Sequence, residues 1–280
     1  MRNIPATLPL SLCHLSEINA SPVELLEAAG KAGFSSISLR FAPIVPSDVN
    51  FPLVNPSEQH AVRSAINATG VSLLFMEFLW MVDGPAPVDT WLRVLESGKS
   101  VGASRLMVGG MSDQPEATAE KFAQICELAA SHDVAVDLEP IAAAKTASFA
   151  QGVEIVRKAG TPKNAGVLLD VLHFARANGT MDDLKRGADL ISVFHLCDAP
   201  AKPPAGGVEA IAKEASENRL LPGDGSLAIW PLITEIPQDC LMGVEVPMNT
   251  LFPDLTSLAR LTKLHDACRR FLTSEPNSRT

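Results

Sequence analysis

Four ionisable residues in the second half of the chain lie within stretches that are otherwise apolar. These residues are Glu139 in VAVDLEP, Asp170 in AGVLLDV, His195 in LISVFHL and Glu245 in LMGVEVP. Taken one at a time, such a carboxylate is commonly a helix N-cap and such a histidine is commonly a buried residue with ordinary hydrogen bonds. The set is harder to explain in that way, because burying acids is unfavourable unless a cation or a partner compensates them.

Three carboxylates and one imidazole form a donor set in which hard oxygen atoms dominate. Such a set suits Mn²⁺, Mg²⁺ or Co²⁺, with Zn²⁺ as a further candidate. Four protein ligands would leave one or two positions of an octahedron for a substrate carbonyl and its neighbouring hydroxyl. An ion held there would acidify the C–H group next to the carbonyl. The residue types therefore predict one divalent metal ion and a reaction that begins with proton abstraction beside a carbonyl.

Eight short apolar runs recur along the sequence and predict buried β-strands. They cover residues 8–13, 35–41, 71–78, 104–110, 134–140, 165–171, 190–196 and 241–247. Amphipathic stretches separate most of the runs and predict helices. The first of these opens with a capping box, in which Ser21 caps, Pro22 takes the first helical position and Glu24 completes the box. Apolar strands that alternate with helices predict a parallel α/β sheet, and the count of eight predicts closure into a single (β/α)8 TIM barrel.

The predicted barrel would bring the four ionisable residues together. Reactive groups in this fold come from the carboxyl ends of the strands, which all open at one mouth. Glu139, Asp170, His195 and Glu245 lie at or near the ends of the fifth to eighth predicted strands. Four adjacent strands would therefore each deliver one metal ligand at the same level.

The chain of 280 residues shows no change of composition that would mark a second domain. We expect one domain over residues 1–273 and a polar C-terminal tail over 274–280. Prolines and glycines at about 198–224 predict a long loop over the barrel mouth, with a short helical segment inside it. Loops of that length in compact domains are commonly functional. Asp198, at the start of this loop, is expected to orient either the loop or His195.

Composition limits the class of partner and the compartment. A formal net charge of −9 argues against nucleic acid and against anionic membranes, because both select basic surfaces. No run approaches the roughly 20 apolar residues of a membrane-spanning helix. The five cysteines form no CxxC pair and predict reduced thiols in a cytoplasmic protein. The expected partner is a small-molecule substrate.

Several short motifs resemble those of the xylose isomerase-like barrel superfamily, which includes sugar phosphate isomerases and epimerases. The motifs are LEP at Glu139, LLDVLHFARANG at Asp170 and His173, FHLCD at His195 and Asp198, LPGDG, and VEVP at Glu245. The resemblance implies the same four metal ligands. It also implies that Glu139 and Glu245 exchange protons with the substrate through an enediolate, and that His173 contacts a substrate oxygen. The implied activity is that of a metal-dependent isomerase or epimerase of a sugar, sugar phosphate or polyhydroxy acid, and such relatives are often homo-oligomers.

Two departures from the resemblance concern charge. Many relatives end the second strand with a glutamate where this chain has Arg40, and ketose epimerases carry a second glutamate where it has Lys145. If both side chains point inward, they suit an anionic substrate such as a carboxylate. A surface position for Lys145 is the alternative. An anionic substrate would favour a lyase that resembles the inosose and dehydroshikimate dehydratases of the superfamily. An endonuclease IV-like phosphodiesterase is more remote, because six histidines are few for a cluster of several metals.

Further residues are expected to line the substrate pocket. Arg219 precedes LPGDG and is expected to reach over the mouth, with a solvated surface arginine as the alternative. His14 follows the first predicted strand, and Glu77 lies at the end of the third. Phe78, Trp80 and Met81 would add an apolar wall, which favours a substrate less hydroxylated than a free hexose.

Overall fold

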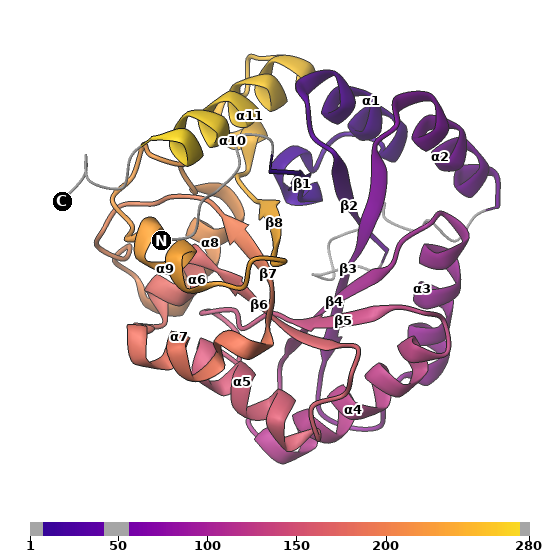
Figure 1. The fold of residues 1–280 in the computed structure, drawn as a ribbon, viewed down its shortest axis with the longest axis vertical. Helices are drawn as coiled ribbons and strands as arrows, with labels where there is room; N and C mark the ends of the chain where they lie inside the picture. The colour runs from indigo at the N-terminus through magenta and orange to yellow at the C-terminus, as the bar shows by residue number, and fades with distance from the viewer. Residues whose placement is uncertain (1–7, 42–55, 275–280) are drawn as a thin grey trace.

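The computed structural model describes residues 8–41 and 56–274, and within these ranges eight parallel strands close into one barrel (Figure 1). Each strand pairs with the next one in sequence, and β8 closes the ring on β1. The strands are β1 (Leu10–Leu12), β2 (Ser36–Arg40), β3 (Ser72–Met81), β4 (Arg105–Gly110), β5 (Ala135–Leu138), β6 (Ala165–Asp170), β7 (Ile191–Leu196) and β8 (Leu241–Val244). The prediction of a single (β/α)8 TIM barrel is confirmed.

Helices form a ring around the barrel (Figure 1). They are α1 (Pro22–Ala32), α2 (Pro56–Thr69), α3 (Val88–Ser100), α4 (Pro115–Ala130), α5 (Phe149–Lys158), α6 (Val171–Arg176), α7 (Met181–Gly187), α8 (Gly207–Glu217), α9 (Ile229–Glu235), α10 (Met248–Leu251) and α11 (Ser257–Thr273), with short 3-10 turns η1 (His14–Glu17) and η2 (Ala188–Leu190). The predicted capping box is present, since Ser21 and Glu24 each accept the other's backbone N–H. None of the described helices is both long and apolar enough to cross a membrane.

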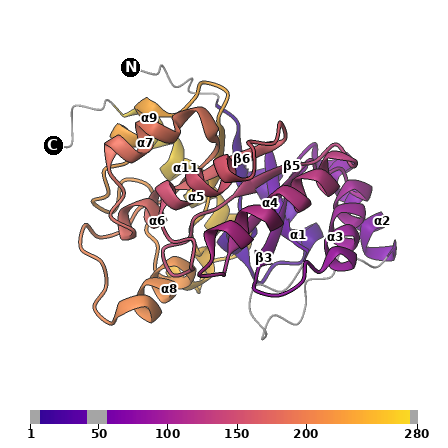
Figure 2. The same cartoon turned by 90° about the horizontal axis from the view of Figure 1, so that it is seen from below.

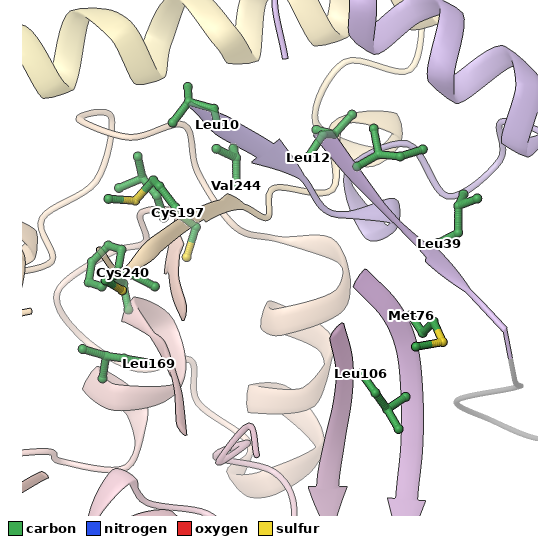
Figure 3. Close-up of a cluster of buried hydrophobic side chains, with 14 of the residues drawn as sticks. Leu10, Leu12, Leu39, Met76, Leu106, Leu169, Cys197, Cys240 and Val244 are labelled. Carbon is green, nitrogen blue, oxygen red and sulfur yellow. The ribbon is translucent and has the colours of Figure 1, made fainter. Parts of the chain in front are cut away.

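The strands bury apolar side chains on both of their faces, as parallel barrel strands must. Side chains of the outer face pack against the helices in one large cluster. Figure 3 labels nine of its members, which are Leu10, Leu12, Leu39, Met76, Leu106, Leu169, Cys197, Cys240 and Val244. A separate cluster that includes Leu168 and Val193 fills the barrel interior. Asp170 and His195 follow these two residues by two positions, so they point to the same interior one layer nearer the mouth.

An ion pair between a buried aspartate and a half-buried arginine lies one layer below the mouth. Asp137 precedes Glu139 by two residues and therefore shares its face of β5. Arg105 donates to both carboxylate oxygens of Asp137, at 2.8 and 2.5 Å, and the Ser192 hydroxyl donates to the same group at 2.5 Å. Asp137 is thus compensated within the fold, whereas Glu139 is the acid that this segment delivers to the mouth.

The segment predicted as a long mouth loop contains α8 and an isolated antiparallel bridge between Asp198 and Leu220. In Figure 2, α8 lies at the opposite end of the barrel from α7 and α9. The Arg176 guanidinium donates to both carboxylate oxygens of Glu214 on α8, at 2.6 and 2.7 Å, and this buried pair docks α8 against α6. The Asp198 carboxylate accepts, at 2.8 to 3.1 Å, the backbone N–H groups of Ala199, Gly223, Gly225 and Leu227.

Candidate metal centre and substrate pocket

The four ionisable residues predicted to bind a metal converge at the carboxyl end of the barrel. Asp170 is the last residue of β6 and His195 lies in β7, whereas Glu139 and Glu245 directly follow β5 and β8. All four residues are buried. One ligand atom from each lies within 4.8 Å of the others. The four side chains therefore form one candidate metal-binding cluster.

The imidazole of His195 tests whether an ion fits this cluster. Its Nδ1 atom lies 3.9 Å from Glu139 Oε1, 3.8 Å from Asp170 Oδ2 and 3.6 Å from Glu245 Oε2. Nδ1 is buried and has no hydrogen-bond partner among the described residues, which is unfavourable for a polar atom. Ligand atoms about 2.1 Å from a shared ion lie about 3 to 4 Å from one another. The separations around Nδ1 agree with that spacing, so the residues fit a divalent ion.

Two neighbours fix the orientation of the His195 ring. The sulfur of Cys13 lies 3.4 Å from the second ring nitrogen, Nε2. Gly243 is the register partner of His195 across the β7–β8 pair, and a Cβ atom at this glycine would lie 2.5 Å from His195 Cδ2. The glycine therefore leaves the space that the ring occupies, and Cys13 contacts the nitrogen that faces away from the carboxylates.

We expect Gly243→Ala to weaken divalent-metal binding by about 10- to 100-fold, the range that follows loss of an outer contact of a ligating histidine. The added methyl group would displace the His195 ring from the carboxylates. Calorimetric titration with Mn²⁺ measures the effect. Gly98→Ala is the matched control, because its methyl group would crowd Met76 in the outer cluster instead. Equal Kd values for wild type and Gly243→Ala would contradict this role of the glycine.

Arg219 lies between two of the candidate ligands. It is only 2% exposed, and its Nη1 and Nη2 atoms lie 2.6 Å from Asp170 Oδ2 and 2.7 Å from Glu245 Oε2. Its Nε–H donates to the carbonyl oxygen of Ala215 at 2.7 Å, which ties the guanidinium to α8. Arg219 is therefore a buried part of the acid cluster, where its charge compensates two carboxylates.

The two glutamates of the cluster have opposite pKa shifts. Burial raises the pKa of Glu139 to about 8, and the nearby carboxylate of Glu245 adds to the rise. Burial opposes ionisation of Glu245 too, but Arg219 and His195 outweigh it and hold the pKa of Glu245 below its usual range. Without a metal, Glu139 is protonated and Glu245 is ionised at neutral pH. Two carboxyl groups with separated pKa values can act as proton donor and proton acceptor.

Asp170 serves two structural purposes. Its Oδ1 atom accepts the backbone N–H of His173 at 2.9 Å and caps α6, while its Oδ2 atom faces His195 and Arg219. The N-cap role of Asp170 is therefore compatible with a second role as a candidate metal ligand. The His173 ring is buried, and burial lowers the pKa of His173 to about 4 against the opposing effect of Asp170. His173 is neutral at pH 7, and its Nδ1 accepts the N–H of Ala142 at 3.4 Å.

A pocket of about 390 Å³ opens onto the acid cluster, which is within the size range of small-molecule sites. The predicted site residues in its lining are Arg40, Glu77, Glu139, His173, Arg219 and Glu245. The apolar part of the lining includes Leu15, Phe78, Trp80, Met107, Met111 and Ile141. The pocket thus combines a polar wall at the acid cluster with a largely apolar remainder.

Arg40 and Glu77 face each other in the pocket wall, with Arg40 Nε 3.7 Å from Glu77 Oε2. Glu77 also accepts hydrogen bonds from the backbone N–H of His14 and from the Ser38 hydroxyl. The Nδ1 atom of His14 accepts the backbone N–H of Arg40 at 3.1 Å. His14 is buried and is not one of the described residues that line the pocket. His14 therefore positions the Arg40–Glu77 pair through hydrogen bonds to both residues.

Lys145 is not brought into this pocket. Its ammonium group lies 2.9 Å from Asp113 Oδ2, both side chains are exposed, and Lys145 is absent from the described pocket lining. Asp113 lies beyond the end of β4, so the neighbouring loop supplies an outward partner for the lysine. The surface alternative therefore describes Lys145. Of the predicted basic residues, Arg40 and Arg219 line the pocket, and each of them faces carboxylates.

Sequence reasoning missed Cys13 and Gly243 as neighbours of the centre. The sequence position of each residue gave a weak indication that it lies near the centre. Gly243 precedes Glu245 by two residues and so shares its strand face, and Cys13 directly follows β1 at the mouth. Pairing the predicted seventh and eighth strands in register would have put the glycine against His195. Met107 in β4 and Met111 directly after β4 line the pocket wall and were missed too, because an apolar residue in or beside a strand is commonly core.

Comparison with known proteins gives a family match. The family model described as "Xylose isomerase-like TIM barrel" matches residues 26–258. No curated protein matches the sequence.

Solved structures of several proteins are similar to this chain at low sequence identity. The IolI protein, solved with a bound zinc atom, has a TM-score of 0.75 and 17% identity over 95% of this chain and 98% of its own. A probable 3-DHS dehydratase from Bacillus anthracis has a TM-score of 0.70 and 14% identity over 93% and 98%. A D-allulose 3-epimerase from Methylomonas sp. has a TM-score of 0.66 and 14% identity over 94% and 98%. These likenesses establish the shared fold.

Proposed function

Because this chain belongs to the xylose isomerase-like TIM barrel family, we propose that it is a divalent-metal-dependent isomerase or epimerase that moves a proton beside the carbonyl of a hydroxyketone. The observation that carries the proposal is the buried His195 Nδ1 atom, which faces three carboxylates and has no hydrogen-bond partner in the part of the chain that the structure describes. The similarity in fold to a D-allulose 3-epimerase supports the same reaction class. Mn²⁺, Mg²⁺ or Co²⁺ is the proposed ion, and the zinc in the IolI structure keeps Zn²⁺ as an alternative.

Glu139, Asp170, His195 and Glu245 would hold the ion, which when bound would polarise a substrate carbonyl and acidify the neighbouring C–H group. Once the ion has displaced the proton of Glu139, both glutamates are carboxylates. Glu245, held ionised beside Arg219, is the proposed proton acceptor, and Glu139 is the proposed donor after it receives that proton from Glu245. They follow β8 and β5, which lie three strands apart in the ring of eight, so they can approach a bound carbon from two sides.

His173 has a separate proposed role at the substrate oxygen. Its neutral ring accepts the Ala142 N–H at Nδ1, and a neutral imidazole that accepts at one nitrogen carries its proton on the other. The Nε2–H group of His173 is therefore the proposed hydrogen-bond donor to a substrate oxygen in the pocket that this residue lines.

Metal binding should depend on pH in the metal-free protein. Burial raises the pKa of Glu139 to about 8, so an arriving ion must displace its proton. Burial lowers the pKa of His195, but Cys13 and Glu245 outweigh that effect and raise it well above its usual value, so His195 releases a second proton. We expect the affinity for Mn²⁺ to rise about tenfold or more per pH unit between pH 6 and about 8. Calorimetry in buffers of different ionisation enthalpy should show one proton fewer released by Glu139→Gln, and equal proton release by the two proteins would be inconsistent with a protonated Glu139.

Dehydration of a cyclic keto-acid is the second candidate, and the observation that favours it is Arg40 in the pocket wall. A guanidinium group there could bind a substrate carboxylate. Glu77 offsets the charge of Arg40, and Lys145 faces Asp113 outside the pocket, so the positive charge available for an anion is small. The isomerase or epimerase proposal therefore ranks first.

The deciding experiment incubates the Mn²⁺-loaded protein with hydroxyketones and ring keto-acids in D₂O. Proton NMR follows loss of the C–H signal beside the carbonyl, and mass spectrometry follows loss of water. Exchange without loss of water is expected, and chelation of the metal should stop it. Loss of water would support the dehydratase instead. Exchange that continues after exhaustive chelation would exclude the proposed metal-dependent reaction.

A further inference from the structure

The pocket wall away from the acid cluster is built from one part of the barrel. Phe78 and Trp80 come from β3, Met107 from β4, and Met111 and Ile141 from the segments that follow β4 and β5. The candidate ligands lie at or near the carboxyl ends of β5 to β8. A molecule bound to the ion would therefore extend its other end toward β3 and β4, where the wall is apolar.

This apolar wall has a fixed shape. The rings of Phe78 and Trp80 pack edge to face, with centroids 4.8 Å apart. They rest against Gly109 of β4, where a Cβ atom would lie 2.6 Å from Trp80 and 2.7 Å from Phe78. Met111 is 39% exposed although it is a large apolar residue. An apolar side chain held in a pocket and open to solvent is a common contact for an apolar ligand.

The polar side chains of the same described lining are largely engaged by other groups. Arg40 and Glu77 face each other. Lys213 lies 3.9 Å from Glu217 at the exposed surface of α8, and the Ser216 hydroxyl donates to the backbone of its own helix. A substrate with several hydroxyl groups beyond the reacting carbons would lose water there without gaining matched partners, which is unfavourable.

We propose that the substrate of this site is a hydroxyketone whose metal-binding end is followed by an apolar tail, either aromatic or branched alkyl, instead of a chain of hydroxyl groups. The tail lies against Phe78, Trp80, Met107, Met111 and Ile141, and the hydroxyketone faces the acid cluster. This assignment rests on the proposed function for its chemistry, but the shape and polarity of the wall can be tested by binding alone.

The test compares 1,3-dihydroxy-4-phenylbutan-2-one with D-ribulose and D-fructose, which share the reacting hydroxyketone and differ in the tail. Deuterium exchange at the carbon beside the carbonyl gives kcat/KM, and calorimetry with the Mn²⁺-loaded protein gives Kd. We expect the phenyl compound to bind more tightly and to exchange with a kcat/KM higher by about tenfold or more.

Met111→Gln and Ile141→Gln should each lower that preference by about fivefold or more, since each replaces apolar contact with an amide. Val208→Gln, at an exposed apolar residue of α8 outside the described lining, should leave the preference unchanged.

Each outcome separates this inference from the proposed function. D-Ribulose or D-fructose binding and exchanging as well as the phenyl compound would overturn the apolar-tail assignment and leave the proposed reaction standing. Tighter binding of the phenyl compound without exchange of any compound would overturn the reaction and support the ligand class. Absence of both binding and exchange for all three compounds would overturn both.

Discussion

Glu139→Gln and Glu245→Gln should each lower kcat by about 10²- to 10⁴-fold at saturating Mn²⁺, the contribution expected of a positioned acid or base. Glutamine keeps the shape and one oxygen but can neither accept nor deliver the proton as a carboxyl group does. The two residues lie in one buried cluster and follow strands that are three apart in the ring of eight, so they can face one bound substrate from two sides. Initial rates of deuterium exchange into a substrate hydroxyketone measure the effect.

Two controls make that comparison specific. Both glutamates are candidate ligands, so Mn²⁺ occupancy must be measured in each variant and the metal raised until the site is full. Glu96→Gln, at an exposed residue of α3, controls for loss of a carboxylate elsewhere. Exchange rates close to wild type in both site variants at full occupancy would remove Glu139 and Glu245 from the proposed chemistry.

Arg219→Met should destabilise the metal-free protein by about 3 to 5 kcal/mol, and Mn²⁺ should recover most of that loss. The guanidinium group is buried and lies 2.6 and 2.7 Å from carboxylates of Asp170 and Glu245. Removing one partner of a buried ion pair leaves the other charge uncompensated, which lowers the free energy of unfolding by about 3 to 5 kcal/mol. A bound divalent ion would compensate the same carboxylates and would also stabilise the folded state by mass action. Urea denaturation with and without Mn²⁺ gives the two free energies of unfolding.

Arg260→Met is the matched control for Arg219→Met. Arg260 is also a buried arginine with a two-point ion pair, but its partner is Glu17, which is not a candidate ligand. Its loss should destabilise the protein in both conditions, with no recovery specific to the metal. Equal destabilisation of Arg219→Met with and without Mn²⁺ would show that Arg219 does not share its carboxylates with an ion.

The candidate ligands could be predicted because each belongs to a local pattern. An acid or a histidine at the end of an apolar strand is visible in the sequence, and strand alternation decides which face it takes. The barrel then places the ends of β5 to β8 side by side without further information. His173 followed in the same way, since it lies one helical turn beyond Asp170 and its backbone N–H is capped by that residue.

Arg219 and Lys145 show where such reasoning ends. The position of Arg219 depends on α8, which is docked by Arg176 and Glu214, residues 38 positions apart in the chain. Nothing local in the sequence reveals that contact. Lys145 was expected near the mouth from the resemblance to ketose epimerases, yet its ammonium group pairs with Asp113 on the neighbouring loop, outside the pocket. Side-chain direction in loops is set by such long-range partners, whereas in strands it is set by alternation.

The central claim is that one divalent ion binds among Glu139, Asp170, His195 and Glu245, and anomalous X-ray scattering from crystals grown with Mn²⁺ tests it most directly. Cys13, His195 and Glu245 form an alternative group of potential ligands on the other side of the imidazole. We predict a single strong anomalous peak next to His195 Nδ1, within bonding distance of the three carboxylates, and its loss in Asp170→Asn. A peak beside Cys13 and His195 Nε2, or no peak in the barrel mouth at saturating Mn²⁺, would contradict the assignment.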